Sequence, residues 1–474
     1  MPRIVNQIMR PVLQRYSMSW LKEKDYRSKS EAYIKEHIKK VSGTGIGRKL
    51  GVTPNTPLRD IPLTHYNFYK PFFENPHRDD FIYPIHDYVR AITSGTMGKP
   101  KTYLLPKTGL WNSIQKTGMT FLFLCTHDGE KITYEVGDVV YHNMPGGQFI
   151  SSFYYDIITN RRIGWVDQVP DPDMPFQEKV DYFLKHHREI DVAYMTVTTL
   201  IDQIYPQIGE PVKLKGFITQ DRSAYALKDK IKEITGNYPK TIFGSTETMF
   251  VALPSIEYPG CFFFDWRVLY SEFIPEEHVV DTSEATTEPF EGILPLNEVE
   301  VGKVYQLVAT PYGNDLIRYA MPDLLECISL EDRIIGSGLP VFRYYARCDN
   351  LIVLHNFTRI NEDELIEVLN RTGAPYVDFV AVREAEFSRD YMKIYVEPQS
   401  TVDEDDLKAK INEQLLEYDK DWHDLTHMLG YLPLKLEILP KGSFHRYLQR
   451  RVGIPKITRI NMTDDHLMLL LGKA

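Results

Sequence analysis

An eleven-residue stretch, 91–101, has a composition suited to holding a polyphosphate. It contains two glycines, three hydroxyl residues and two lysines. Glycine lets the backbone turn sharply and approach a ligand closely, and successive backbone N–H groups in such a turn form a concave anion site. Only two residues separate Gly95 from Gly98, and a proline follows Lys99, so this is not the phosphate loop with four residues between its glycines. An ordinary glycine turn before a strand at 102–105 fits the same residues.

A second polar cluster follows an apolar segment at 240–243 that we expect to be a strand. Gly244, Ser245, Thr246 and Glu247 come directly after it. Ligands of open α/β sheets usually bind beyond the carboxyl ends of the strands, and Mg²⁺ favours one or two carboxylates together with substrate oxygens. The cluster therefore suits a metal and phosphate site, although a simple cap at a strand end would have the same composition.

Two further segments indicate chemistry only weakly by themselves. Asp323 follows an apolar segment, where a carboxylate could accept hydrogen bonds from ribose hydroxyls, but aspartate is also a common turn residue. Arg347 and Asp349 lie in a turn between two expected strands, which alone indicates only a hairpin. The two strands are 342–345 and 351–354.

The spacing of apolar residues indicates which elements must position these side chains. From about residue 108 to 310, short apolar runs alternate with helical patterns, which is typical of parallel sheets with helices on their faces. The expected helices are 108–124, 176–187, 199–205 and 224–235, and the expected strands are 139–144, 191–195, 215–219, 240–243, 262–269 and 304–309.

The C-terminal part has a different pattern, which indicates a compact α+β unit of one small domain. Asn361 and Glu364 are expected to form a capping box at the start of a helix. The expected helices are 361–370 and 403–418, and the expected strands are 377–382, 392–396 and 434–438. We therefore predict an α/β protein with a large N-terminal domain, 1–345, and a small C-terminal domain, 346–474.

Length and composition exclude several classes of protein. At 474 residues the chain exceeds the usual size of one core. Its 43% hydrophobic and 25% charged residues are typical of soluble globular proteins, and a net charge of −10 argues against a general nucleic-acid binder. Four widely spaced cysteines fit reduced thiols, and neither a signal peptide nor a membrane span is visible. We expect a cytoplasmic protein without nucleic-acid or membrane partners.

Taken in order, the four polar segments resemble the core motifs of the adenylate-forming (acyl-adenylate) superfamily across residues about 60–460. These motifs are a glycine-rich loop, a glycine–hydroxyl–glutamate segment, a ribose-binding aspartate and an arginine–aspartate turn. The chain departs from the usual pattern with Met97 for a threonine, Phe243 for a tyrosine, Met321 for a small residue and Ala346 for a glycine. None of these departures removes a charged group.

The resemblance implies two half-reactions. A carboxylate attacks the α-phosphate of ATP, which releases pyrophosphate and leaves an acyl-AMP, and a nucleophile then displaces AMP. The catalytic residues are implied to be Thr246, Glu247 and Lys456, with Glu247 also binding Mg²⁺. The small C-terminal domain is implied to move as a lid about a hinge near 347–349, which includes Asp349. The implied ATP- and AMP-binding residues are Thr93, Ser94, Gly95, Thr96, Gly98, Lys99, Lys101, Gly244, Ser245, Asp323 and Arg347.

Two branches of the superfamily are similar to this chain, the phenylacetate–CoA ligase-like enzymes and the plant-hormone-conjugating acyl-amido synthetases. The segments 340–342 and 360–365 and the tail 441–459 resemble the acyl-amido branch. The resemblance implies a catalytic lysine near the C-terminus. It is assigned to Lys456, because an arginine follows three residues later, as at the terminus of the acyl-amido branch. Lys441 is the alternative, and an ordinary surface position fits either lysine.

The resemblance implies ATP, Mg²⁺ and CoA as cofactors of an acyl-CoA ligase. An amino acid or other amine is the alternative acceptor and would give an amide. A catalytically silent nucleotide-binding regulator is the alternative from another class, and retention of the charged motif residues argues against it. His423 and His427 have the spacing of a zinc pair, but the metalloprotease pattern places Glu, not Asp, after the first histidine. We expect a surface helix end there.

The acyl substrate is expected to be a small carboxylic acid that is aromatic or of medium length and apolar. In the implied architecture its pocket lies between helices of the large domain and the strand before Gly244. Candidate lining residues are Phe243, Met249, Phe250 and the segment 149–155. A role in the hydrophobic core fits these residues equally well.

Overall fold

The computed structural model describes residues 10–93, 101–144, 146–160, 165–280, 282, 284–348, 351–354, 358–386, 389–429, 431–450 and 457–473. These residues form two compact units. The N-terminal unit comprises the described residues of Met1–Thr93 and Lys101–Tyr344, and the C-terminal unit comprises those of Tyr345–Ala474.

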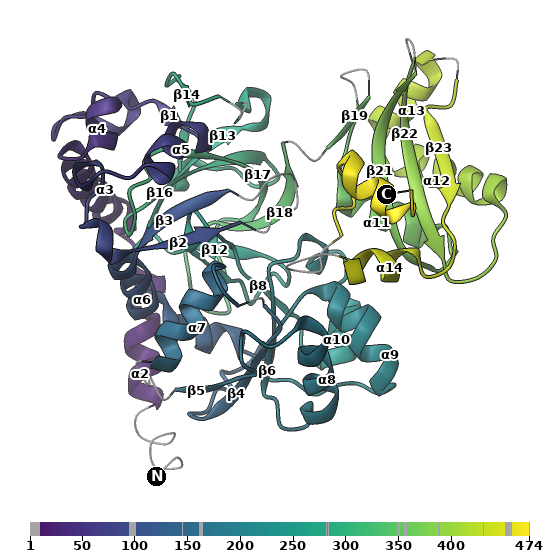
Figure 1. The fold of residues 1–474 in the computed structure, drawn as a ribbon, viewed down its shortest axis with the longest axis horizontal. Coiled ribbons are helices and arrows are strands. Elements are labelled where there is room, and N and C mark those ends of the chain that lie inside the picture. Colours follow the sequence, from purple (N-terminus) through teal and green to yellow (C-terminus); the bar gives the residue numbers. More distant parts are fainter. Residues whose placement is uncertain are drawn as a thin grey trace. The chain divides into compact units, whose positions relative to one another are not determined.

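A parallel five-stranded sheet with the strand order β5-β4-β6-β7-β8 lies in the N-terminal unit (Figure 1). Side chains of successive residues in a strand point to opposite faces. Tyr141, Ala193 and Phe217 pack in one cluster with α8 and α10, whereas Val192 and Ile218 pack on the other face with Cys125 of α6. The strands are β4 (Asp138–His142), β5 (Val166–Val169), β6 (Val192–Tyr194), β7 (Gly216–Thr219) and β8 (Pro239–Thr241). The helices are α6 (Lys107–Cys125), α7 (Ile150–Asn160), α8 (Phe176–His186), a π-helical turn (Thr199–Ile204) that continues into α9 (Tyr205–Ile208), and α10 (Lys228–Thr235).

A nine-stranded and mostly antiparallel sheet forms the rest of this unit, with the main order β11-β12-β18-β17-β16-β13-β15. Its inner face is rich in aromatic residues, including stacked Phe273 and Phe342. The strands are β1 (Leu63–Thr64), β11 (Ala252–Pro254), β12 (Phe262–Phe264), β13 (Leu269–Pro275), β14 (Thr286–Thr287), β15 (Leu294–Pro295), β16 (Val304–Pro311), β17 (Tyr319–Ser329) and β18 (Val341–Arg347).

Among the described residues, two hairpins and four further α-helices complete the N-terminal unit. The hairpin of β2 (Tyr88–Ile92) and β3 (Thr102–Pro106) carries the glycine stretch, and that of β9 (Gly244–Ser245) and β10 (Met249–Phe250) carries the second motif. The helices are α2 (Arg10–Met18), α3 (Tyr26–Ser42), α4 (Gly45–Lys49) and α5 (Tyr66–Glu74).

The C-terminal unit contains a three-stranded sheet, β21-β22-β23, and a separate hairpin of β19 and β20. The predicted capping box is confirmed: the Asn361 side chain accepts from the N–H of Glu364, and Glu364 accepts from the N–H of Asn361. The strands are β19 (Ile352–Leu354), β20 (Thr358–Ile360), β21 (Tyr376–Glu386), β22 (Arg389–Pro398) and β23 (Leu434–Ile438). The helices are α11 (Glu362–Arg371), α12 (Glu404–Tyr418), α13 (Lys420–Leu429), α14 (Ser443–Arg450) and α15 (Asp464–Leu470).

The predicted hairpin between 342–345 and 351–354 is wrong. The first segment belongs to β18, which pairs with β12 through Phe342 and Phe262 and also neighbours β17. The second is β19, which pairs with β20. The physical reason is that Val341 and Phe342 are fully buried, so packing within the large sheet, rather than a local turn, determines their partner.

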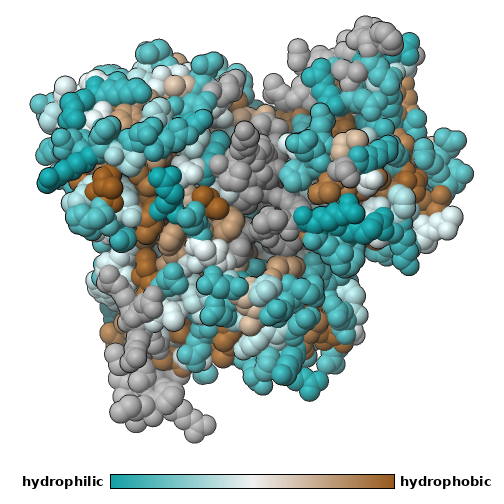
Figure 2. Space-filling view, viewed as in Figure 1, coloured by the Kyte–Doolittle hydropathy of each residue, from teal (hydrophilic) through white to brown (hydrophobic). Residues whose placement is uncertain are grey.

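The visible surface is mostly hydrophilic, with apolar side chains scattered over it (Figure 2). No helix in the described ranges has both the length and the apolar character needed to span a bilayer. No disulfide joins the four cysteines, all of which lie within the described residues, and Cys125, Cys261 and Cys327 are buried. His423 lies in helix α13, and no group of three or more potential metal ligands occurs among the described residues.

Candidate functional site

The hairpin of β2 and β3 holds the two ends of the glycine stretch together. Thr93 donates its N–H to the Lys101 carbonyl at 2.9 Å, and the Lys101 N–H donates to Thr93 Oγ1 at 2.9 Å. Lys101 Nζ lies 5.0 Å from the centre of the Tyr66 ring, within the range of a cation–π contact. Hydrogen bonds therefore fix the two ends of the stretch against each other, and one of these ends carries the ammonium group of Lys101.

Several predicted site residues lie outside the described residues. They are Ser94, Gly95, Thr96, Gly98 and Lys99 of the glycine stretch, together with Met97, and Asp349 and Lys456 nearer the C-terminus.

The second motif forms a tight turn between β9 and β10. Ser245 Oγ lies 2.9 Å from Thr248 Oγ1, and the Ser245 N–H donates to the same hydroxyl at 3.2 Å. Met249 has φ 63°, which is rare for a residue with a side chain. A Cβ on Gly244 would lie 2.8 Å from the Met249 carbonyl oxygen. Glycine is therefore required at Gly244 for the backbone to close this turn.

The turn places Thr246 and Glu247 beside the hairpin of β2 and β3. Thr246 Oγ1 donates to the Ile92 carbonyl at 3.5 Å, and the Glu247 carbonyl accepts from Asn314 Nδ2 at 2.7 Å. Burial raises the pKa of the Glu247 carboxyl, and the negative charge of Asp323 raises it further, while the positive charge of Lys101 lowers it. Glu247 therefore lies within electrostatic reach of both charged residues.

Asp323 lies in β17 and is buried, with 6% of its surface exposed. Its carboxylate accepts a hydrogen bond from the hydroxyl of Tyr344 in the neighbouring strand β18. The Tyr344 ring in turn stacks against Phe243 at 6.1 Å between centroids. The two strands and the β8–β9 connection thus hold the orientation of this carboxylate. The sequence did not identify Tyr344, because its part depends on β18 lying beside β17.

Arg347 and Lys441 are the predicted site residues that the structure describes in the C-terminal unit. Arg347 ends β18 and is partly exposed. Lys441 is exposed in the turn before α14, and its carbonyl accepts from Arg446 Nη1 at 3.1 Å. The α14 N-terminus is held by Glu397, whose carboxylate accepts from the N–H groups of Gly442 and Phe444 at 2.5 and 2.9 Å. Lys441 therefore lies on a well-braced turn.

The residues around Glu247 fit a magnesium ion that arrives with a nucleotide. They offer hard oxygen donors, namely the Glu247 carboxylate and the hydroxyls of Ser245 and Thr246. Burial and the negative charge of Asp323 raise the pKa of Glu247 more than the positive charge of Lys101 lowers it, so a bound cation would stabilise the ionised carboxylate. Mg²⁺ typically takes one or two carboxylates and completes its shell with phosphate oxygens and water.

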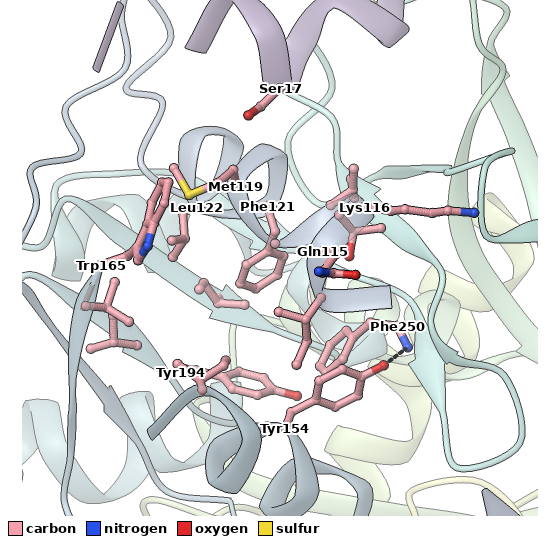
Figure 3. Close-up of a pocket in the computed structure, with 18 of the residues that line it drawn as sticks. Ser17, Gln115, Lys116, Met119, Phe121, Leu122, Tyr154, Trp165, Tyr194 and Phe250 are labelled. Atoms are coloured by element: carbon pink, nitrogen blue, oxygen red, sulfur yellow. Dashed lines mark hydrogen bonds between the residues drawn. The ribbon is translucent and has the colours of Figure 1, made fainter. Parts of the chain in front are cut away.

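A cavity of about 830 Å³ lies beside this turn in the N-terminal unit. Most of its lining is apolar or aromatic, and it is formed by α2, α6, α7 and one face of the parallel sheet. Figure 3 shows Tyr154, Tyr194 and Phe250 grouped at one end, with Met119, Leu122 and Trp165 farther from them. Volume and lining are those of a binding site for an organic molecule.

The predicted acyl-pocket residues divide between this cavity and the core. Phe250 lines the cavity, as do Ser151, Tyr154 and Tyr155 from the predicted segment 149–155. Phe243 and Met249 do not line it; both are buried in the large hydrophobic core, where Phe243 packs on Phe262. Sequence reasoning missed the contribution of α6 and of strand β4, since it did not establish which helix face covers the sheet.

Comparison with known proteins identifies the fold. A family model described as the GH3 family central domain matches residues 262–334. No curated protein sequence gives a significant match.

Solved structures match over nearly the whole chain. The acyl acid amido synthetase AtGH3.15 in complex with 2,4-DB has a TM-score of 0.72 at 12% identity, covering 97% of this chain and 96% of its own. A 2-hydroxyisobutyryl-CoA ligase in the postadenylation state, with R3-HIB-AMP, has a TM-score of 0.64 at 14% identity, covering 94% and 91%. ATP-bound MatB from Rhodopseudomonas palustris has a TM-score of 0.51 at 12% identity, covering 77% and 65%. At these identities the similarity concerns the fold, and it confirms the predicted α/β class with a large N-terminal and a smaller C-terminal part.

Proposed function

We propose that this chain, which has the fold of the adenylate-forming superfamily, is an ATP-dependent, AMP-forming ligase that activates a carboxylic acid. The resemblance predicted from the four motifs is confirmed by the structural matches. One observation carries the proposal: Lys101 and Asp323, from two other motifs, lie within electrostatic reach of Glu247 beside a large apolar cavity. A cytoplasmic setting, where ATP is abundant, is part of the same proposal.

In the first half-reaction, an oxygen of the substrate carboxylate attacks the α-phosphorus of ATP and pyrophosphate leaves. The residues 93–101 would bind the β- and γ-phosphates, with Lys101 supplying charge from the base of the hairpin. Thr246 would contact the phosphate or the acyl carboxylate, and Asp323 would accept hydrogen bonds from the ribose hydroxyls. Phosphoryl transfer depends mainly on such positioning and charge stabilisation, so no protein nucleophile is required.

Glu247 would hold Mg²⁺ together with phosphate oxygens. When bound, the ion neutralises charge on the phosphates. Glu247 itself keeps a carboxylate next to the nucleotide despite its burial, and the Asn314 hydrogen bond to the Glu247 carbonyl at 2.7 Å holds its backbone in place.

The roles of the C-terminal residues belong to the proposal. Lys456, or Lys441 as the alternative, would bridge the substrate carboxylate and the α-phosphate as two anions approach each other. Arg347 would bind the nucleotide, and Asp349 would lie at a hinge between the two half-reactions. A Lys456→Ala enzyme that adenylates at the normal rate would move this assignment to Lys441.

The acyl acceptor is either the thiol of CoA or an amine such as an amino acid. In both cases the acceptor attacks the acyl carbonyl carbon and AMP leaves. The GH3 central-domain match at residues 262–334 favours the amine, because the amido synthetase with the highest TM-score quoted above shares the GH3 name. The match to the CoA ligase structure, which covers 91% of that chain, keeps the thiol of CoA as the other candidate.

Hydroxylamine trapping tests activation without knowledge of the acceptor. The protein is incubated with ATP, Mg²⁺, hydroxylamine and a panel of carboxylic acids, and hydroxamate and pyrophosphate are measured. We expect both products with at least one apolar acid. Nucleotide binding without either product for any acid would instead identify a silent regulator. With an active acid, CoA and a set of amino acids then compete as acceptors, and the product is identified by mass.

A further inference from the structure

Tyr194 carries a phenolic hydroxyl into the cavity from the carboxyl end of β6. It is the last residue of this strand, and its side chain lines the cavity. Strand register pairs it with His142 of β4 on one side and with Ile218 of β7 on the other. Tyr194 packs in the same cluster as Ile218 and Cys125 of α6. Its side chain therefore lies on the face of the parallel sheet that α6 covers and that forms one wall of the cavity.

The hydroxyl of Tyr194 forms no hydrogen bond with any residue that the structure describes. The group is open rather than sealed in the core: Tyr194 is partly exposed, and Figure 3 shows its oxygen directed toward Tyr154 at one end of the cavity. Burial raises the pKa of Tyr194, so the hydroxyl keeps its proton at neutral pH. Because a phenol donates one hydrogen bond, a ligand in the cavity meets a neutral donor that the protein does not use.

The neighbouring polar groups of the cavity have partners of their own. Tyr154 accepts from the Phe250 N–H at 3.3 Å, as the dashed line in Figure 3 shows, and donates to a serine hydroxyl of α6. Lys116 donates to the Arg267 carbonyl at 2.8 Å, and its side chain extends away from this end of the cavity in Figure 3. The end at which Tyr154 and Phe250 meet therefore offers a ligand an uncharged surface with a free hydroxyl on it.

This hydroxyl lies away from the reacting end of the site. The second motif begins after β8, and β7 lies between β6 and β8 in the sheet. Two strand spacings of about 4.8 Å place Tyr194 about 10 Å across the sheet from β8. The electrostatics agree, because besides burial it is the Asp221 carboxylate, and not that of Glu247, that raises the pKa of Tyr194. An acid whose carboxylate lies beside Glu247 therefore presents its body to Tyr194.

We propose that the substrate is a bulky acid whose apolar body carries an uncharged oxygen acceptor remote from the carboxylate, such as a ketone or an ether, and that the Tyr194 hydroxyl donates a hydrogen bond to this oxygen and selects the substrate. This inference rests on the proposed function. An acid without the acceptor buries the hydroxyl and leaves it without a partner, which costs free energy. A second carboxylate at this place would be buried without a counter-charge, so diacids of the same length are poor substrates.

The test compares matched pairs of acids of equal length. Alkanoic and phenylalkanoic acids are paired with their keto forms, in which a carbonyl replaces one methylene at varied distances from the carboxylate. For the best pair we expect the wild type to prefer the keto acid by about 10-fold or more in kcat/KM of hydroxamate formation. Tyr194→Phe removes only the hydroxyl and should bring this ratio close to one.

A ratio measured within one enzyme does not depend on how much of a variant folds. Tyr141→Phe is the matched control, because Tyr141 lies on the other face of the same sheet, donates to the Lys179 carbonyl at 2.9 Å and does not line the cavity; it should keep the wild-type ratio. A wild type that does not prefer the keto acid in any pair, or an unchanged preference in Tyr194→Phe, would overturn the inference. Absence of hydroxamate with every acid would instead overturn the proposed function.

Binding then decides the inference independently of turnover. Trp111 and Trp165 line the cavity, so quenching of tryptophan fluorescence measures the affinity for the same pairs without ATP. A preference for the keto acid that Tyr194→Phe removes would support the inference. Equal affinities within every pair would contradict it.

Discussion

Asp315 should make the stability of the N-terminal unit depend on pH in a defined direction. This carboxylate is 3% exposed and accepts hydrogen bonds from the Ile82 N–H at 2.6 Å and from the Tyr88 hydroxyl at 2.7 Å. It thereby fixes the start of β2, the strand that leads to Thr93. Burial raises the pKa of Asp315 from 3.8 to about 6, and the two hydrogen bonds only partly oppose this.

The sign follows from linkage. The pKa of Asp315 is higher in the folded than in the unfolded state, so ionisation of its carboxyl opposes folding. The free energy of unfolding therefore falls as the pH rises from about 3.8 through 6. Raising the pKa from 3.8 to about 6 lowers the free energy of unfolding by about 3 kcal/mol once ionisation is complete. About 1 kcal/mol of this is already lost at pH 4.5, so about 2 kcal/mol is lost between pH 4.5 and 7.5.

Asp315→Asn removes the titration, so the comparison isolates it. The unfolding free energy of each protein is measured by urea titration at pH 4.5 and 7.5, followed by tryptophan fluorescence. Four of the five tryptophans, all except Trp422, lie in the N-terminal unit, so the signal reports mainly on that unit. Loss of one hydrogen bond lowers the unfolding free energy of the variant equally at both pH values. The difference in unfolding free energy between variant and wild type should nevertheless change by about 2 kcal/mol in favour of the variant between pH 4.5 and 7.5.

The control is Asp229→Asn, an exposed aspartate of α10, for which the difference from wild type should stay within about 0.5 kcal/mol at both pH values. A difference for Asp315→Asn that is constant between pH 4.5 and 7.5 would refute the reasoning, because it would mean that Asp315 ionises as easily in the folded unit as in the unfolded chain.

Three further predictions concern the site and its support. Glu247→Gln should lower acid-dependent pyrophosphate release by about 100-fold or more without lowering the melting temperature, because burial and a neighbouring carboxylate disfavour its charge. Gly244→Ala should lower acid-dependent pyrophosphate release by about 10-fold or more, since the new Cβ would lie 2.8 Å from the Met249 carbonyl oxygen and displace the turn. Arg318→Met should destabilise the N-terminal unit by about 3–5 kcal/mol in urea titration, because it leaves Glu272 buried without its bidentate partner; adding Glu272→Met should recover part of this loss.

The two variants of the second motif, Gly244→Ala and Glu247→Gln, each have a matched control. Gly338→Ala introduces a Cβ that meets no atom within 4 Å, and it should leave pyrophosphate release unchanged. Glu189→Gln changes an exposed glutamate and should likewise be neutral. A Glu247→Gln protein that is fully active, a Gly244→Ala protein that equals Gly338→Ala, or an Arg318→Met protein as stable as wild type would contradict the corresponding account.

The sequence predicted the parts of the fold that depend on local periodicity and chain order. Alternating apolar runs and helical patterns indicated the parallel sheet, and its strands β4, β6, β7 and β8 lie within or beside the predicted segments. Asn361 and Glu364 indicated a helix start because their hydrogen bonds are local. The order of the four polar motifs indicated the fold through the resemblance to the adenylate-forming superfamily, whose reaction depends on those residues.

Features that depend on distant packing could not be predicted in this way. Segment 342–345 was expected in a hairpin because a turn follows it, but burial of Val341 and Phe342 places it in the large sheet. Phe243 and Phe250 are both aromatic and close in sequence, yet one lies in the core and the other lines the cavity.

The central claim is that the carboxylate of a substrate acid forms a bond to the α-phosphorus of ATP. The direct measurement uses an acid labelled with ¹⁸O in both carboxylate oxygens, together with ATP, Mg²⁺ and an acceptor, and determines the mass of the nucleotide product. We expect AMP that carries one ¹⁸O atom, since the acyl–oxygen bond of the acyl-AMP breaks when the acceptor attacks the carbonyl carbon. Unlabelled AMP, or ADP as the product, would contradict it.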